Sequence, residues 1–175
     1  FHVAGREGQG WTPFFLARFA GQPLKSVAIE WVHAQGHVIR RQGEFVASTY
    51  GVEGSLIYAA SALLRDDLAQ GAARLMLDLL PDKSQEQVRA EVCRPRGSRS
   101  LSSHLKSRLG LDGVKTGLIY ELCTPECLAQ PEALARSLKN LSIPLKRPRP
   151  VAEAISTAGG VTWASMTPGG MLKQR

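Results

Sequence analysis

The chain has 175 residues, with 22 lysines and arginines against 15 aspartates and glutamates, and a net charge of +7 at neutral pH. This length suits one domain, or a barrel with a small satellite, and it is sufficient to bury a hydrophobic core. Because the chain shows no apolar run of about 18 residues and no signal-peptide pattern, we expect neither a membrane span nor a secretory signal.

The N-terminal region is rich in glycine and begins at Phe1 instead of a methionine, so we expect a piece of a longer protein. Its GREGQG run is not expected to be a nucleotide-binding loop, because no apolar strand precedes it and no Lys-Ser or Lys-Thr follows it. Residues 11–20 predict a short amphipathic helix that ends at Gly21 and Pro23. Residues 24–33 and 37–41 predict two strands joined by a hairpin turn.

Residues 43–67 combine two hydrophobic periods that meet at Gly51. Alternating side chains up to Thr49 predict a further strand, and apolar residues at helical spacing from Val52 onward predict a helix. A strand that leads directly into a helix points backbone N–H groups and the positive end of the helix dipole at one place, where an anion can bind. A plain structural joint is the alternative, because strand-to-helix turns with glycine are common.

The rest of the chain changes from β to helical character and back. Residues 72–80 predict a strand, and Ser84 predicts the N-cap of a helix that continues to residue 91. Short helices broken by glycine and proline are predicted over residues 100–141. Residues 143–145 and 151–157 restore β character around a proline-rich segment.

This order predicts an α+β fold with two parts. Residues 94–142 are expected to form a small all-helical subdomain. Residues 1–93 and 143–175 are expected to form the β-rich part, which carries one long helix. Near its end, the pair Gly159 and Gly160 would let the backbone pass close to a neighbour or a ligand, although a plain turn explains the pair equally simply.

The cysteines indicate the compartment. Cys93, Cys123 and Cys127 are too few, and odd in number, for the disulfide framework of a secreted domain. We therefore expect free, buried thiols and a cytoplasmic protein. The spacing of Cys123 and Cys127 without a second pair is weak for zinc, so we expect no metal site.

Positive charge is concentrated in two segments. Residues 94–115 and 136–149 hold eleven lysines and arginines and a single aspartate, so the remaining residues carry a net negative charge. Such clustering indicates a polyanion as partner. A solvated face, or docking on another domain or a phosphorylated cofactor, is an equally good interpretation of the charge alone.

Two stretches, GEFVASTYGVEGSLIYAASALLR and EAISTAGGVTWASMTPGGMLK, resemble the best-marked parts of the inserted domain of HI0933-like flavoproteins, also called the BaiN/RdsA family of FAD-dependent oxidoreductases. Almost the whole chain fits, and the nearest subgroup is that of the uncharacterised flavoproteins, with segments such as LDLLPD and RGSRSLSSHL. The resemblance implies a β-barrel-like domain that carries a small helical subdomain and is inserted in a Rossmann-type FAD domain.

The resemblance also implies roles for particular residues. The cofactor-binding set is Thr157, Gly159 and Gly160, and the substrate-facing set is Thr49, Tyr50, Gly51 and Glu53. The family's G-x-G-x-x-G fingerprint and its closing glycine-rich segment are absent from these residues. We therefore expect FAD to be held by the FAD-binding domain of the same polypeptide, and we assign no catalytic residue here.

Three functions remain open at this point. The first is a substrate-side insert of a FAD-dependent oxidoreductase. The second is an RNA-binding module, because the helical block resembles helix-two-turn-helix elements and some family members are linked to reduction of uridine in ribosomal RNA, others to small organic substrates. Its contacts would be Arg96, Arg99, Lys106, Arg108, Lys139 and Arg147. The third is a purely structural insert.

Overall fold

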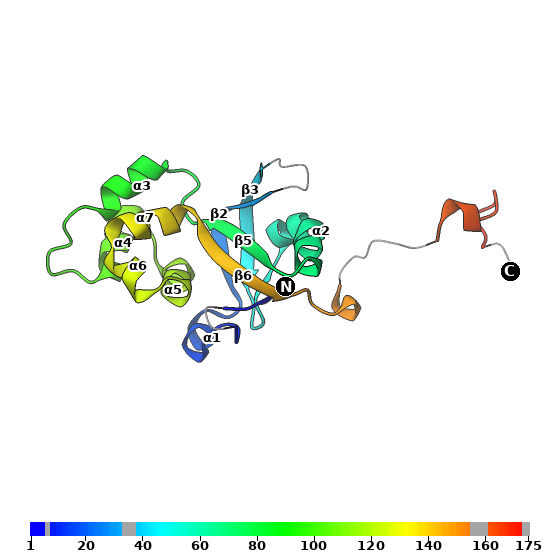
Figure 1. Cartoon of the computed structure of the whole chain (residues 1–175), viewed down its shortest axis with the longest axis horizontal. Helices are drawn as coiled ribbons and strands as arrows, with labels where there is room; N and C mark the ends of the chain where they lie inside the picture. The colour runs from blue at the N-terminus through cyan, green and yellow to red at the C-terminus, as the bar shows by residue number, and fades with distance from the viewer. Residues whose placement is uncertain (6–7, 33–37, 155–160, 173–175) are drawn as a thin grey trace.

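The computed structural model describes residues 1–5, 8–32, 38–154 and 161–172. Within this part of the chain, six strands form one antiparallel sheet in the order β1-β6-β5-β2-β3-β4 (Figure 1). The strands are β1 (His2–Val3), β2 (Gln22–Val32), β3 (Val38–Ala47), β4 (Val52–Glu53), β5 (Ala73–Asp78) and β6 (Leu141–Arg147).

The sheet curls until its two edge strands meet. The amide of Val3 donates to the carbonyl of Tyr50 at 3.2 Å, and the amide of Val52 donates to the carbonyl of Phe1 at 3.1 Å. His2 and Gly51 form the bridge between them. The expected β-barrel-like domain is therefore confirmed as a nearly closed six-strand barrel, and we call the contact between β1 and residues 50–52 the seam.

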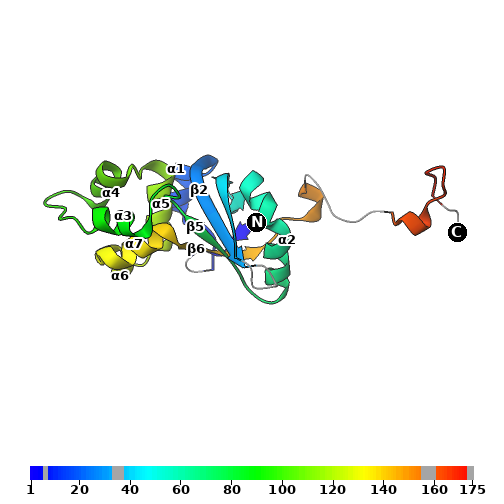
Figure 2. The same cartoon turned by 90° about the horizontal axis from the view of Figure 1, so that it is seen from above.

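The helices fall into three groups. Helix α1 precedes β2, and helix α2 packs on strands β3 to β6. Helices α3 to α7 lie between β5 and β6 in the chain and gather at the side of the barrel away from α2 (Figure 2). The bounds are α1 (Pro13–Phe19), α2 (Ser55–Ala69), α3 (Gln85–Val92), α4 (Leu101–Leu109), α5 (Gly113–Leu122), α6 (Pro125–Ala129) and α7 (Pro131–Lys139).

The local signals explain most of these bounds. Thr12 caps α1 and Ser100 caps α4 by accepting a backbone amide, and Ser84 and Gln87 form a full capping box on α3. Gly110, in the left-handed conformation with a φ of 68°, ends α4. These cap side chains accept hydrogen bonds from backbone amides in the first turn of each helix, which have no partner within the helix.

Four predictions from the sequence need correction. Strand β3 is continuous, not two strands, because it pairs with β2 from Gln22 to Val32 apart from a shift between Leu24 and Val27. The segment at Val52 is strand β4, not the start of the helix, because it pairs with β3 across the seam turn. Residues Val151–Glu153 form a 3-10 turn, not a strand. Cys93 is exposed, not buried, at the C-terminal end of α3.

The helical block, defined here as α3 to α7, begins earlier than the sequence signal. The predicted subdomain starts at residue 94, whereas α3 already packs on α4 and α7. The block interrupts a β5–β6 hairpin, since Leu77 pairs with Leu141 and the amide of Leu79 donates to the carbonyl of Leu138 at 3.0 Å. The two chain connections between the helical block and the barrel therefore lie at the same end of the barrel, which we call its mouth.

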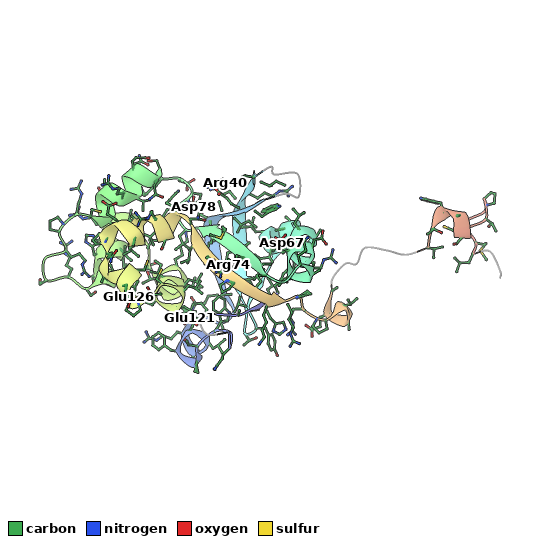
Figure 3. The ribbon with its side chains drawn as sticks, viewed as in Figure 1. Arg40, Asp67, Arg74, Asp78, Glu121 and Glu126 are labelled. Atoms are coloured by element: carbon green, nitrogen blue, oxygen red, sulfur yellow. The ribbon has the colours of Figure 1, made fainter. Side chains whose placement is uncertain are left out.

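Asp78, the last residue of β5, ties the barrel to the helical block at this mouth. Its carboxylate is 1% exposed, and Oδ2 accepts from Arg40 of β3 and from Lys139 of α7 at 2.7 Å each. The amide of Leu80 donates to Oδ1 at 2.9 Å. Figure 3 shows Arg40 and Asp78 together at the end of the sheet that meets the helices. One buried carboxylate thus joins two strands and a helix.

Lys115 of α5 makes a second tie. Its Nζ donates to the carbonyls of Ser26 at 3.1 Å and Leu79 at 2.9 Å. Burial lowers the pKa of Lys115. Ser26 lies in the bulge of β2 and has a φ of 49°, a left-handed conformation that is costly for a residue with a side chain. The bulge therefore supplies a carbonyl to the helical block.

A third tie joins α5 to α1. Glu121 is buried and accepts hydrogen bonds from the amide of Thr12 at 2.6 Å and from its hydroxyl at 2.7 Å. A Cβ at Gly117 would lie 2.4 Å from the ring of Phe19, so this glycine allows the two helices to approach closely. The three ties together leave the helical block little freedom to move against the barrel.

We predict that Gly51→Ala weakens the seam. A Cβ at residue 51 would lie 2.2 Å from the carbonyl oxygen of Phe1 and 2.7 Å from the amide of Val3. Overpacking of this kind costs about 1–3 kcal/mol, so urea unfolding should show that loss of stability. Gly169→Ala is the matched control, because the nearest atom to its Cβ is the Thr167 hydroxyl at 4.0 Å. Equal stability of the two variants would contradict a closed seam.

Candidate functional site

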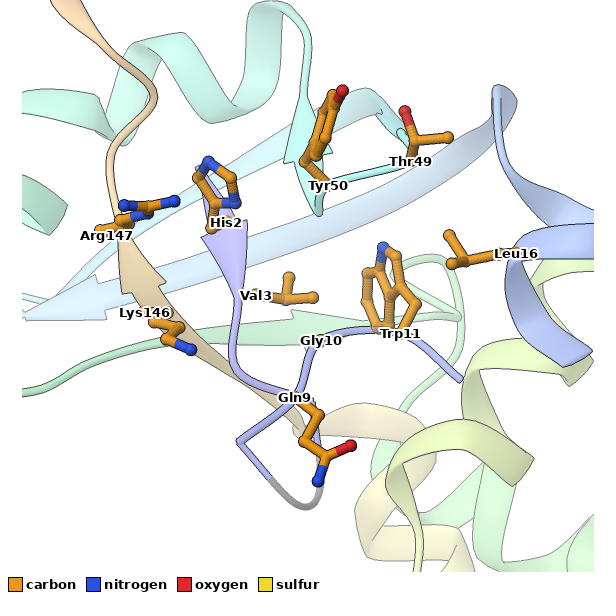
Figure 4. A pocket seen from close by; sticks show the side chains of 10 residues that line it. All are labelled: His2, Val3, Gln9, Gly10, Trp11, Leu16, Thr49, Tyr50, Lys146 and Arg147. Atoms are coloured by element: carbon orange, nitrogen blue, oxygen red, sulfur yellow. The ribbon is translucent and has the colours of Figure 1, made fainter. Parts of the chain in front are cut away.

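A hollow of about 340 Å³ opens beside the seam of the barrel (Figure 4). We call it the seam pocket. Its lining comes from the N-terminal strand, the loop before α1, the turn after β3 and the end of β6. The lining residues are His2, Val3, Gln9, Gly10, Trp11, Leu16, Thr49, Tyr50, Lys146 and Arg147.

Trp11 holds the turn that forms one wall of the pocket. Its indole Nε1 donates to the carbonyls of Ser48 at 3.2 Å and Gly51 at 3.3 Å. The turn also closes on itself, because the amides of Ser48 and Gly51 each donate to the other residue's carbonyl. With both ends of the turn fixed, Thr49 and Tyr50 are presented at the surface.

Arg149 fixes the ring of Tyr50 from outside the pocket. Its guanidinium carbon lies 4.0 Å from the centre of that ring, a cation–π contact. The same guanidinium pairs with Glu153, with Nε 2.7 Å from the carboxylate, and its NH1 lies 3.2 Å from Nε2 of His2. The rings of His2 and Tyr50 are 5.6 Å apart. Tyr50 is therefore positioned, although half of its surface is exposed.

The charge of the seam pocket is positive and uncompensated. Lys146 and Arg147 are exposed, and none of the ten described lining residues carries a carboxylate. Burial, then the charges of Arg147 and Arg149, lower the pKa of His2, so its imidazole is neutral at pH 7 and can accept from Arg149. Within the described residues, Arg147 forms no ion pair. The pocket thus combines two cations with hydroxyl groups on Thr49 and Tyr50.

The predicted substrate-facing set is divided by the structure. Thr49 and Tyr50 line the pocket, whereas Gly51 is buried in the seam and Glu53 is exposed on β4 outside the lining. The N-terminus of α2 does not line the pocket. The seam pocket is therefore not the anion site that was predicted at the strand-to-helix turn. The predicted cofactor set, Thr157, Gly159 and Gly160, lies outside the described residues.

Sequence reasoning gave no site role to most of the pocket lining, including His2, Trp11 and Lys146. His2 and Lys146 reach it only because β1 pairs with β6, with His2 opposite Arg147. Trp11 follows the glycine-rich GREGQG run. The only sequence signal for it was a bulky aromatic residue in a glycine-rich segment, which by itself does not distinguish a pocket wall from a core residue.

The predicted nucleic-acid contacts do not form one face. Arg147 lies at the seam pocket, whereas Arg96 and Arg99 lie beyond α3 at the far end of the helical block (Figure 1). Lys139 is 12% exposed and donates to Asp78 and to the carbonyl of Leu80, so its ammonium faces the protein interior. Lys106 pairs with Asp112 at 3.2 Å, and Arg108 approaches Glu91 at 3.8 Å.

Two negative findings apply to the described residues only. No helix there is long and apolar enough to cross a membrane. No three histidine, cysteine, aspartate or glutamate side chains there are grouped so that they could hold a metal ion.

A family model described as "HI0933-like protein barrel and H2TH domain" matches residues 9–156, which include most of the barrel and the whole helical block. No curated protein matches the chain.

We predict that Arg147→Gln raises the pKa of His2 toward its usual value of about 6.5, because one of the cations that lower it is removed. Proton NMR titration of the imidazole measures this, with His2→Gln to assign the signal. Arg74→Gln, an exposed change on β5, should leave the pKa unchanged. An unchanged pKa in Arg147→Gln would contradict the placement of Arg147 beside His2.

The same pKa shift predicts a pH dependence of stability. A histidine whose pKa is lowered by folding binds protons less readily in the folded than in the unfolded state. Its contribution to stability is therefore present above about pH 6.5 and is lost as the pH falls through the lowered pKa.

Proposed function

We propose that this chain, which belongs to the family of HI0933-like barrel and H2TH domains, is the substrate-side insert of a FAD-dependent oxidoreductase. In this proposal the barrel and helical block belong to a polypeptide whose other domain holds the flavin. Cys93, Cys123 and Cys127 form no disulfide bond with one another, which supports a cytoplasmic location for it.

The observation that carries the proposal is the position of the chain ends of the barrel. Strands β1 and β6 are antiparallel neighbours, with His2 opposite Arg147 and Val3 opposite Leu145. The chain therefore enters and leaves the barrel at one place, as an insert in a host domain must. The seam pocket lies at this same place, so a host domain would meet the barrel beside Tyr50 and Arg147.

The described residues do not fit FAD by themselves. FAD is held at a parallel strand–helix–strand unit, whose glycine-rich turn places the pyrophosphate at a helix N-terminus. All pairings in the described sheet are antiparallel. When bound, a flavin supplies electron and hydride transfer, and the role of this chain is to bind and orient a substrate and to exclude water.

The first test measures where the flavin binds. The 175-residue chain should be colourless after gel filtration, and the polypeptide of the full reading frame should be yellow. In the latter, Tyr50→Ala should increase quenching of flavin fluorescence by iodide, because Tyr50 lies where the host domain would meet the barrel and its loss would open that contact to solvent. Tyr58→Ala, at another exposed tyrosine, on α2, is the control. A yellow 175-residue chain, or a colourless full polypeptide, would contradict the proposal.

RNA binding is the second candidate, and one observation favours it. Arg96 and Arg99 are exposed just before the N-terminus of α4, where a cation opposes the helix dipole. Neither forms an ion pair with the described residues, and among these residues the guanidinium of Arg99 makes only a 3.5 Å contact with the hydroxyl of Ser107. Their position has no stabilising role in the helix, and a phosphate partner would explain it.

We predict that Arg96→Gln with Arg99→Gln weakens binding to structured RNA and flattens its salt dependence. Each phosphate contact to a single strand contributes about −0.7 to the log-log slope, so loss of two contacts should reduce the slope by about 1.4. Arg41→Gln with Arg65→Gln, both exposed on the barrel side, removes the same charge as a control. An equal loss in the control, or no RNA binding at low salt, would exclude a specific RNA face.

A further inference from the structure

The seam pocket has the properties of a binding site for a small ligand, apart from any flavin. Its volume of about 340 Å³ lies at the small end of ligand pockets, which span roughly 300–1,000 Å³. Its floor is formed by Val3 and Trp11, which are 2% and 6% exposed and belong to the core cluster. The wall at Thr49 and Tyr50 is held by Trp11 and Arg149 before any ligand arrives.

The charge of the pocket selects the kind of ligand. Arg147 has no carboxylate partner among the described residues, and Lys146 makes only a 3.3 Å contact with the carbonyl of Gly8. Arg149 differs from them, because Glu153 neutralises it. In Figure 4 the two unneutralised cations extend from one side of the hollow, while Trp11 and Leu16 lie across Val3 on the other side. The pocket therefore has one cationic end and one apolar end.

The polar groups at the rim complete this pattern. The hydroxyls of Thr49 and Tyr50 make no hydrogen bond to other described residues, so both can donate to an oxygen of a ligand. The indole N–H of Trp11 is already used by two carbonyls, so only its ring is offered to a ligand. Guanidinium and hydroxyl donors around an apolar floor match an anion that carries a flat body.

We propose that the seam pocket binds a small organic anion. Its carboxylate or phosphate lies between Lys146 and Arg147, and its planar apolar body lies over Val3 toward Trp11 and Leu16. The assignment of this anion as the oxidoreductase's substrate rests on the proposed function, whereas binding itself does not require a flavin. A polynucleotide is less suited to this place, because the pocket is small and the loop that carries Arg96 and Arg99 lies away from it, at the far end of the helical block.

The test uses the 175-residue chain without flavin, so its outcome is independent of the cofactor. The ¹⁵N-labelled chain is titrated in separate samples with benzoate, phenyl phosphate and neutral benzamide. Benzoate or phenyl phosphate should produce saturable shifts of the Trp11 indole and of the amides of Thr49 and Tyr50. Which of the two anions binds more tightly distinguishes a carboxylate ligand from a phosphate ligand. Benzamide should produce no saturable shift at the same concentrations.

Variants locate the anion. Arg147→Gln should weaken binding about tenfold or more, as expected for loss of one charge-assisted hydrogen bond, and circular dichroism should show an unchanged fold because the residue is exposed. Arg41→Gln, which removes the same charge outside the pocket, should bind with unchanged affinity. The proposal is overturned if neither anion shifts these signals, if benzamide binds equally well, or if Arg41→Gln loses as much affinity as Arg147→Gln.

The outcomes of this test and of the flavin test separate the two proposals. Anion binding to the chain together with a colourless full polypeptide would support the anion site and contradict the proposal of a FAD-dependent oxidoreductase. A yellow full polypeptide without anion binding to the chain would support the oxidoreductase proposal and contradict the anion site. Lys146 and Arg147 would then be assigned to docking on the host domain.

Discussion

The buried carboxylate of Asp78 is the interaction on which the arrangement of this protein depends. The helical block is an interruption of a β5–β6 hairpin, and such an interruption could in principle hinge at its two chain connections. Asp78 lies at that mouth, with its Oδ2 2.7 Å from both Arg40 and Lys139. Removing one partner from a buried ion pair is costly, because the remaining charge is left without compensation. The barrel and the helical block are therefore coupled where they meet.

This coupling has a consequence for function. The seam pocket lies beside the barrel, whereas the loop before α4, which carries Arg96 and Arg99, lies at the far end of the helical block (Figure 1). A single RNA face of the six predicted basic residues is therefore not available, since Lys139 pairs with the buried Asp78 and Arg147 lies at the pocket. The two concentrations of positive charge in the sequence therefore fall on separate parts of the surface. Lys146 and Arg147 line the seam pocket, and Arg96 and Arg99 are exposed in the loop before α4.

The sequence predicted what local patterns determine and missed what long-range pairing determines. The capping signals at Ser84 and Ser100 placed two helix starts correctly, because a cap depends on neighbours three residues away. Val52 was predicted in a helix because its apolar spacing suits one, yet its amide donates to the carbonyl of Phe1 across the seam. His2 and Lys146 are separated by almost the whole chain, so no spacing rule could bring them to one pocket. Asp78 likewise follows an ordinary strand pattern, and only the fold brings Lys139 to it.

A double-mutant cycle on Asp78 and Lys139 tests the coupling of barrel and helical block most directly. Urea unfolding is measured for Asp78→Asn, Lys139→Met and the pair, with Asp82→Asn as an exposed control. Asp78→Asn should lose about 3–5 kcal/mol, since it leaves Lys139 and Arg40 without their buried partner. The account predicts that the pair loses less than the sum of the single changes, with a coupling of about 1–3 kcal/mol. Additivity within about 0.5 kcal/mol would contradict it, because the two residues would then act independently.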